Sequence, residues 1–144
     1  MPSNPVLQAI SFEEVLRRVE AAQVELVSGR PEAFKGLWSH RDDVTLVGGL
    51  GGEIERGWSA VARRLDWVST QFFEGSRAHQ EVSRAVGQDV AYVVQRETIR
   101  FRLPGQKGKV TQVLRATMVF RREDGTWRIV HRHADALTMP TGTQ

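Results

Sequence analysis

Four long segments in the second half of the chain alternate as β-strands do, and they constrain the fold more than any other feature. They are RAHQEVSRAV, DVAYVVQRETIRF, KVTQVLRATMVFRR and TWRIVHRHADAL, and the turn signals between them are GQD, PGQKG and EDG. Short connections with glycine beside a polar residue are typical of hairpins. The sequence therefore predicts an antiparallel meander of long strands.

Three helical segments and one short strand precede this meander. Ser11 and Glu14 form a capping box ahead of apolar residues at helical spacing, which predicts a first helix from about residue 12 to Val27. Pro31 suits the first turn of a short second helix, PEAFKGLW, and a third helix follows Gly57. Between them, VTLV predicts an early strand that ends at GGLGG. This order predicts an α+β domain with the helices packed on one face of the sheet.

Length and composition exclude several classes of protein. The 144 residues suit one domain, 1–144, with a core of about 12–137 and a loose tail at 138–144. The chain has no cysteine, which excludes a disulfide framework and thiol chemistry. Its 20 Lys and Arg exceed its 17 Asp and Glu only slightly and are scattered, so we expect no nucleic-acid partner. No stretch resembles a membrane span or a signal peptide, so we expect no membrane partner and a cytoplasmic location.

Two stretches of this sequence resemble one known family. The segment EAFKGLWSHRDDVTLVGG and the closing strands VLRATMVFRREDGTWRIVHRHAD resemble the SnoaL-like, ketosteroid isomerase-like branch of the nuclear transport factor 2 superfamily, over about Phe12 to Leu137. The resemblance implies a conical barrel, in which a strongly curved, mainly antiparallel sheet wraps around three N-terminal helices and leaves a pocket between them. It also implies a homodimer through the outer face of the sheet and a small organic ligand, and we expect no cofactor.

The acid/base positions familiar from this family do not carry acids here. The base of the isomerases corresponds to Gly48 or Gly49, their acid to Met118, and the aspartate of the cyclases to Arg132. None of these residues can move a proton as that chemistry requires, so steroid isomerisation is not expected. The sequence predicts a small-molecule-binding protein or enzyme with an apolar pocket and unassigned activity. An enzyme would be a lyase, cyclase or hydrolase that uses general acid/base chemistry; the alternative is a non-catalytic dimeric assembly module with a vestigial pocket.

The last strand, WRIVHRHADA, presents two faces if it alternates strictly. By the family register, the outer face forms the dimer contact and carries Trp127, Ile129, His131 and His133. An alternative for the two histidines is a three-ligand metal site, completed by Asp135 or by His79 from another strand.

The opposite face of this strand is expected to line the pocket, together with the even positions of the second long strand and three tryptophans. Arg96 and Arg132 would then suit an anionic ligand, because a guanidinium pairs with a carboxylate or phosphate through two hydrogen bonds. Alternatively they reach the rim, or pair with Asp42, Asp43 or Glu97, and the tryptophans fill the core. The expected lining is Trp38, Trp58, Trp67, Tyr92, Val94, Arg96, Ala116, Met118, Val130, Arg132 and Ala134.

The catalytic candidates are His40, Asp43 and Tyr92. His40 lies close in sequence to Asp42 and Asp43, either of which could orient it as a general base, and Tyr92 could face the same cavity. The segment SHRDD is also typical of a turn or cap, so a structural role stays open. The GGLGG segment lacks the GK[ST] ending of a phosphate loop and is interpreted as a flexible loop at the pocket edge.

Overall fold

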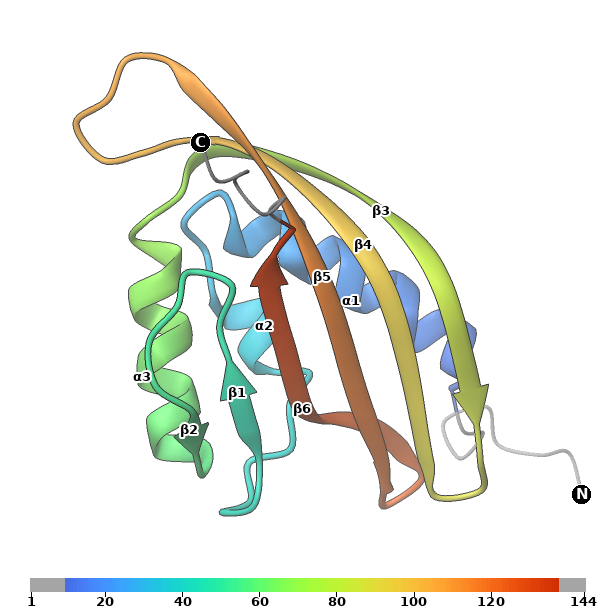
Figure 1. The fold of residues 1–144 in the computed structure, drawn as a ribbon. Helices are drawn as coiled ribbons and strands as arrows, with labels where there is room; N and C mark the ends of the chain where they lie inside the picture. Colours follow the sequence, from blue (N-terminus) through green and yellow to red (C-terminus); the bar gives the residue numbers. More distant parts are fainter. Residues whose placement is uncertain (1–9, 138–144) are drawn as a thin grey trace, which may run out of the picture.

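A computed structural model describes residues 10–137 and shows three helices on one face of a single six-stranded sheet (Figure 1). This is the α+β arrangement that the sequence predicts, while the expected loose tail, 138–144, lies outside the described residues. No helix within 10–137 is both long and apolar enough to cross a membrane. The elements are α1 (Phe12–Leu26), α2 (Glu32–Lys35), β1 (Thr45–Val47), β2 (Glu55–Arg56), α3 (Trp58–Ser69), β3 (Phe73–Val86), β4 (Val90–Arg102), β5 (Lys109–Glu123) and β6 (Thr126–Ala136).

The sheet has the strand order β2-β1-β6-β5-β4-β3. Strands β3 to β6 form the predicted antiparallel meander, and β1 pairs in parallel with β6. The two-residue strand β2, which follows the GGLGG loop and pairs with β1, is an element that the sequence did not predict. Figure 1 shows the long strands bending over α1, which lies behind them.

Helix α1 begins as the sequence predicts, because the side chain of Ser11 accepts a hydrogen bond from the backbone N–H of Glu14 at 3.1 Å. Helix α3 ends at Ser69, earlier than the apolar stripe up to Phe72 suggests. Phe72 is still buried, because its ring packs edge-on against Phe101 of β4 at 4.6 Å between centroids. The apolar spacing thus located the buried face of α3 correctly but overestimated its length.

A β-bulge in β6 changes which residues face the core. Phe120 of β5 pairs with Ile129, whereas the preceding Val119 pairs with His131, so Val130 has no partner. The extra residue reverses the alternation along the strand. Trp127 and Ile129 are therefore buried in the core, and the prediction that they form an outer face with the two histidines was wrong.

The alternation along β4 is also opposite to the predicted one. Met118 of β5 pairs with Val93, so Val93 must share its inward face, and the odd residues of β4 point to the helices. Tyr92, Val94 and Arg96 consequently lie on the outer face of the sheet. The buried residues of β4 are Ala91, Val93, Gln95, Glu97, Ile99 and Phe101.

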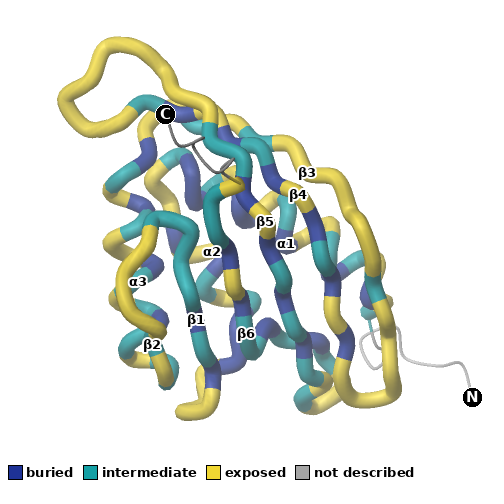
Figure 2. Tube along the Cα trace, viewed as in Figure 1, coloured by how far each residue is buried: buried dark blue, intermediate teal, exposed yellow. Residues whose placement is uncertain are grey.

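Burial is concentrated on the inward faces of β4, β5 and β6, while β3 is mostly exposed along its length (Figure 2). The apolar core forms two clusters, one that contains Val93 and Trp38 and one that contains Ile99 and Phe72. Along β4, Gln95 and Glu97 stand between the two clusters. The core therefore encloses polar groups at its centre.

Gly75 allows the start of β3 to pass close to the end of α1. A Cβ atom at this position would lie 2.1 Å from the carbonyl oxygen of Val27. We expect Gly75→Ala to lower the free energy of unfolding by about 1–3 kcal/mol, because backbone has to move to make room. Urea denaturation would measure this. Gly108→Ala is the control, since its Cβ meets nothing within 4 Å and should change stability by less than about 0.5 kcal/mol.

Candidate functional site

The buried carboxylate of Glu97 is held by four hydrogen bonds. Arg132 of β6 donates to its two oxygens at 2.9 and 2.7 Å, and Arg77 of β3 donates at 3.3 Å. The side-chain amide of Gln95 donates a fourth bond at 2.7 Å. Glu97 itself has no exposed surface. Every hydrogen bond to this carboxylate comes from inside the protein.

The groups around Glu97 keep it ionised although it is buried. Burial alone would raise the pKa of this carboxyl, but Arg132, Arg77 and Gln95 outweigh that effect and hold its pKa well below the usual range. Burial likewise opposes the charge on Arg77, whose pKa is nevertheless raised by Glu20 and Glu97. The cluster is therefore a set of fixed charges.

The cluster continues through Arg77 to a histidine. Arg77 donates from Nε and Nη2 to the two carboxylate oxygens of Glu20 on α1, at 2.9 and 3.0 Å. The same carboxylate lies 3.0 Å from Nδ1 of His79 on β3. Arg77 and His79 both face inward, because they are two residues apart on one strand and pair with Ile99 and Glu97. One unbroken chain of contacts thus joins Arg132, deep in the core, to His79.

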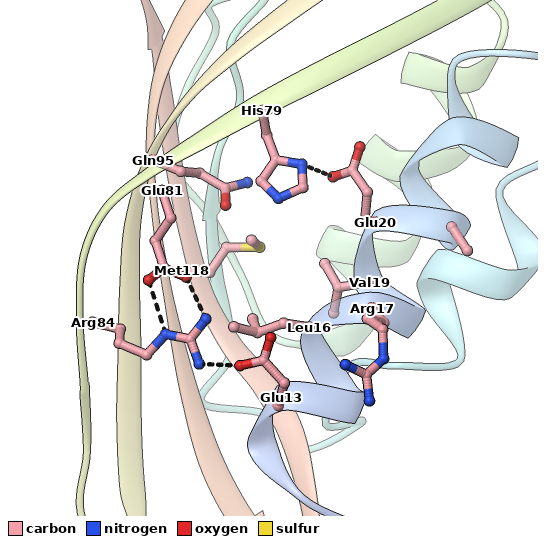
Figure 3. Close-up of a pocket in the computed structure, with 11 residues that line it drawn as sticks. Glu13, Leu16, Arg17, Val19, Glu20, His79, Glu81, Arg84, Gln95 and Met118 are labelled. Atoms are coloured by element: carbon pink, nitrogen blue, oxygen red, sulfur yellow. Dashed lines mark hydrogen bonds and ion pairs between the residues drawn. The ribbon is translucent and has the colours of Figure 1, made fainter.

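The contact with Glu20 fixes the chemistry of His79. A carboxylate can only accept hydrogen bonds, so the Glu20 carboxylate, 3.0 Å away, favours a proton on Nδ1 of His79. In the neutral form of the ring, the other nitrogen, Nε2, then carries the lone pair. Figure 3 shows this nitrogen turned toward the space beside Gln95, Met118 and Val19. A neutral histidine oriented in this way can act as a general base.

A cavity of about 460 Å³ lies between α1 and the inward face of β3 to β5, with this histidine in its wall. Its volume is within the range of small-molecule sites. Apolar side chains from α1 and β5 line one part of it, and charged side chains from α1 and β3 line the rest (Figure 3). The lining residues are Glu13, Leu16, Arg17, Val19, Glu20, Ala21, His79, Glu81, Arg84, Gln95 and Met118.

A second, much smaller cavity of about 60 Å³ touches Arg132. Its wall is mostly apolar and includes Gly48, Gly49 and Leu50 of the GGLGG loop. The space corresponds to about two water molecules. Arg132 lines this small cavity and Gln95 lines the large one, and both bind Glu97, so the ion cluster lies between the two spaces.

The structure brings together only part of the expected pocket lining. Met118 lines the large cavity and Arg132 the small one, while Ala116 and Ala134 face inward as predicted and pack in the core. The bulged Val130 is partly buried against the main core cluster. Tyr92, Val94 and Arg96 lie on the opposite face of the sheet and cannot reach either cavity. Arg132 pairs with Glu97, which was one of the alternatives left open.

The tryptophans do not form an aromatic wall around either cavity. Trp38 is buried in the core, and the partly buried Trp58 packs against the same core cluster. Trp67 is 43% exposed, with the guanidinium of Arg64 4.3 Å above its ring. The core-filling alternative is therefore the one that the structure shows for Trp38 and Trp58.

The predicted catalytic candidates do not meet. The ring of His40 stacks on Trp58 at 3.9 Å between centroids, and its Nε2 lies 3.1 Å from the backbone oxygen of Lys35. Asp43 pairs with Arg121 at 2.8 Å, which holds the pKa of Asp43 below its usual value. Tyr92 lies on the outer face of the sheet. The prediction of a His40 dyad with Asp43 or Tyr92 was wrong.

His131 and His133 lie on the outer face of β6, as predicted. Nδ1 of His131 is 2.8 Å from the hydroxyl of Thr45, and burial lowers the pKa of His131. His79 lies on the other face of the sheet, so it cannot join them. Among residues 10–137 no three histidine, aspartate or glutamate side chains are grouped closely enough to hold a metal ion. The alternative three-ligand site is thus not formed there.

The sequence indicated only part of the ion cluster. It gave Arg132 with Glu97 as one alternative pair and His79 as a metal ligand, but nothing in it pointed to Arg77, Glu20 or Gln95. One signal could have corrected the phase of β4: in the segment IRFR, the apolar Ile99 and Phe101 alternate with arginines and mark the inward face. That phase would have placed Gln95 and Glu97 inside.

Solved structures with the same fold confirm the architecture. One is a protein from Thiobacillus denitrificans, provisionally assigned as a calcium/calmodulin-dependent protein kinase type II association domain, with 22% identity, a TM-score of 0.72 and coverage of 91% of this chain and 98% of that chain. Another, from Streptomyces avermitilis, is provisionally assigned as a dehydratase of the NTF2-like family, with 22% identity, a TM-score of 0.72 and coverage of 90% and 100%. A type 2 hexachlorocyclohexane dehydrochlorinase is 14% identical with a TM-score of 0.70, over 88% of this chain and 85% of that chain.

These similarities show an α+β fold that this chain shares with proteins named as NTF2-like. The profile of the SnoaL-like domain matches residues 18–139, and the chain belongs to this family. No curated protein matches the sequence. The resemblance seen in the sequence is thereby confirmed. The structures with the same fold named above are all less than 25% identical to this chain, so the activity has to be inferred from the site itself.

Loss of the Glu97 charge should destabilise the protein strongly. Glu97→Gln leaves two buried guanidinium groups without their carboxylate, so we expect the free energy of unfolding at pH 7 to fall by about 3–5 kcal/mol. Asp135→Asn is the matched control, because it removes a half-exposed partner of Arg115 and should cost less than about 1 kcal/mol. Urea denaturation followed by tryptophan fluorescence measures both.

The same variant should change the response to acid. In the unfolded chain Glu97 takes up a proton near its ordinary pKa of 4.5, whereas in the folded chain its pKa lies lower, so acid favours the unfolded state. This contribution is complete above about pH 5 and is lost as the pH falls further. Glu97→Gln should show a shallower loss of stability in acid. An identical acid profile for both proteins would contradict the assignment.

Proposed function

We propose that this protein is an enzyme that removes a proton from a small organic molecule held between α1 and the curved sheet. His79 is the general base and Glu20 orients it. The observation that carries the proposal is the 3.0 Å contact between Nδ1 of His79 and the Glu20 carboxylate, in the wall of the 460 Å³ cavity. In this proposal the cavity is the pocket of the family's cone-shaped barrel.

The geometry suits a base that must accept and then return a proton. When Nε2 of His79 takes a proton, the ring becomes positively charged, and the adjacent Glu20 carboxylate stabilises that charge. Arg77 holds Glu20 by two parallel hydrogen bonds, which prevents the carboxylate from turning away. The protonated ring can then give its proton to a leaving group or to another atom of the same molecule.

Among the reactions that use such a base, we favour elimination over cyclisation and hydrolysis. The names of two structures with this fold, a dehydrochlorinase and a provisional dehydratase, denote the loss of hydrogen chloride and of water. Both reactions require removal of a proton from the substrate, for which one base of the His79 type is sufficient. Within the classes that the sequence left open, we therefore propose a lyase.

A chromogenic probe tests the base without knowledge of the natural substrate. When a base removes the proton on C3 of 5-nitrobenzisoxazole, the N–O bond breaks and the electron pair ends on oxygen as 2-cyano-4-nitrophenolate. We expect the protein to accelerate this elimination and His79→Gln to lose about 100-fold or more, the usual contribution of a general base. Absorbance of the phenolate gives the rate.

The matched control is His133→Gln, which changes a half-exposed histidine on the outer face and should keep the rate. Glu20→Gln should lose less than His79→Gln, because the base remains but its orientation and charge compensation weaken. An equal rate for the wild-type protein and His79→Gln would eliminate His79 as the base.

A second proposal concerns assembly through the outer face of the sheet. Val90 and Tyr92 of β4 are 54% and 39% exposed on that face, and His131 and His133 lie there on β6. We propose that these residues form the contact of a homodimer, without Trp127 and Ile129, which are buried in the core. A purely structural role as an assembly module is the competing function, and structures with this fold include two provisionally assigned association domains.

Sedimentation of the untagged protein at micromolar concentration should show a dimer. Tyr92→Asp places a charge in the proposed contact and should shift the protein toward the monomer by at least about 10-fold in dissociation constant. Val24→Asp is the control, because Val24 has the same exposure, 39%, but lies on α1. A wild-type monomer, or equal effects of both variants, would refute this contact.

A further inference from the structure

We propose that the cavity beside His79 selects an uncharged substrate that carries a hydroxyl or amino group, and that the carbonyl oxygen of Gln95 accepts a hydrogen bond from this group. The inference rests on the proposed function, because it takes His79 as the base that faces the same molecule. It concerns which molecules the site binds, and it names a residue that determines this specificity.

The charged side chains in the cavity wall already have partners within the protein. Arg84 donates to Glu81 at 2.9 and 2.7 Å and to Glu13 at 2.6 Å, so the three charged groups at the end of the cavity toward the N-terminus of α1 bind one another and leave one negative charge in excess (Figure 3). Arg17 pairs with Glu14 at 2.7 Å. A charged ligand would have to displace one of these pairs or lose its hydration without compensation, and either is costly.

The remaining carboxylate in the wall is also compensated. Glu20 accepts two hydrogen bonds from Arg77, and Nδ1 of His79 lies 3.0 Å from the same carboxylate. The two arginines once expected to bind an anion are not available to this cavity. Arg132 points its Nη1 and Nη2 donors at Glu97, and Arg96 lies on the outer face of the sheet. The expectation of an anionic ligand therefore has no free cation to support it here.

The ion cluster fixes how the amide of Gln95 is oriented. One end of this amide lies 2.7 Å from Oε2 of Glu97. Since Glu97 is held as a carboxylate between two arginines and can only accept, the NH₂ group of Gln95 must be the end that faces it. The carbonyl oxygen is thereby directed away from Glu97, and Figure 3 shows it on the cavity side of the side chain.

Both polar atoms that the cluster directs to the cavity are hydrogen-bond acceptors. In the neutral ring Nε2 of His79 is an acceptor, because Glu20 favours the proton on Nδ1, and Oε1 of Gln95 is an acceptor because Glu97 holds the NH₂ group. A ligand that offers only acceptors, such as a carboxylate, an ether or a simple ketone, would leave these atoms unsatisfied. A ligand with a donor next to the proton to be removed would satisfy both.

The apolar part of the cavity wall determines which hydrocarbon framework the substrate can have. Leu16, Val19 and Met118 form an apolar surface opposite the histidine, with both apolar side chains of α1 on the same face of the helix. This surface suits a ring or a branched hydrocarbon. The substrate class is therefore an uncharged, mainly apolar molecule with a hydroxyl or amino group, such as a phenol or a hydroxylated ring.

Three matched probes separate these features: phenol, which has a donor; anisole, which has the same ring but no donor; and benzoate, which is an anion. Each is titrated into ¹⁵N-labelled full-length protein, and the side-chain NH₂ signals of Gln95 and the ring nitrogens of His79 report binding. Phenol should bind about 3- to 10-fold more tightly than anisole, as expected for one hydrogen bond, and at least about 10-fold more tightly than benzoate.

Gln95→Met keeps the size of the side chain and removes the acceptor, so it should abolish the preference for phenol over anisole. Gln80→Met on the exposed side of β3 is the control and should keep it. Benzoate binding as tight as phenol, or no binding of phenol, would overturn the substrate class. A phenol preference that survives in Gln95→Met but disappears in His79→Leu would overturn the role of Gln95.

These outcomes are distinct from failure of the proposed function. The probe 5-nitrobenzisoxazole has neither a hydroxyl nor an amino group, so its elimination reports on the base alone. A protein that opens this probe through His79 but does not discriminate phenol from anisole retains the proposed function and loses this inference. A protein that discriminates the two ligands but shows no His79-dependent elimination loses the proposed function.

Discussion

The structure depends on one carboxylate, that of Glu97, held between two buried arginines at the centre of the core. Removal of a charge from water is costly, so this carboxylate is tolerated only where several donors converge on it. The donors come from β3, β4 and β6, and Arg77 extends the same network to Glu20 on α1. The meander and the first helix must therefore dock together in one arrangement for every charge to find its partner.

This constraint also shapes the candidate site. An apolar core at the same place would close the domain equally well, but it would leave Gln95 free to turn and Glu20 without a fixed partner. With Glu97 charged, the amide of Gln95 can point only one way, and Arg77 locks the carboxylate that orients His79. A buried ion pair adds little net stability on average, whereas it specifies geometry strongly when all its hydrogen bonds are made. In this protein, the specified geometry is that of the cavity wall.

Much of the fold could be predicted from the sequence, because local patterns encode it. Apolar spacing located the three helices, and alternation with glycine turns located the four long strands. The faces of the strands were harder to predict, since they depend on pairing between strands. An unpaired Val130 reverses β6, and only the register with β5 reveals that β4 turns its odd residues inward. The contact between Glu20 and His79 joins a helix to a strand far along the chain, and no spacing in the sequence encodes it.

The bulge at Val130 lets a single strand serve two surfaces. Before it, the strand sends Trp127 and Ile129 into the core; after it, the same strand sends Arg132 inward and both histidines outward. The two halves of β6 therefore follow opposite alternations of inward and outward side chains. An exchange of one side chain for another in β6 alters the contacts of a single residue. The loss or gain of one residue there would move the side chains of half the strand to the opposite face of the sheet. The length of this strand is therefore under stricter constraint than most of its individual residues.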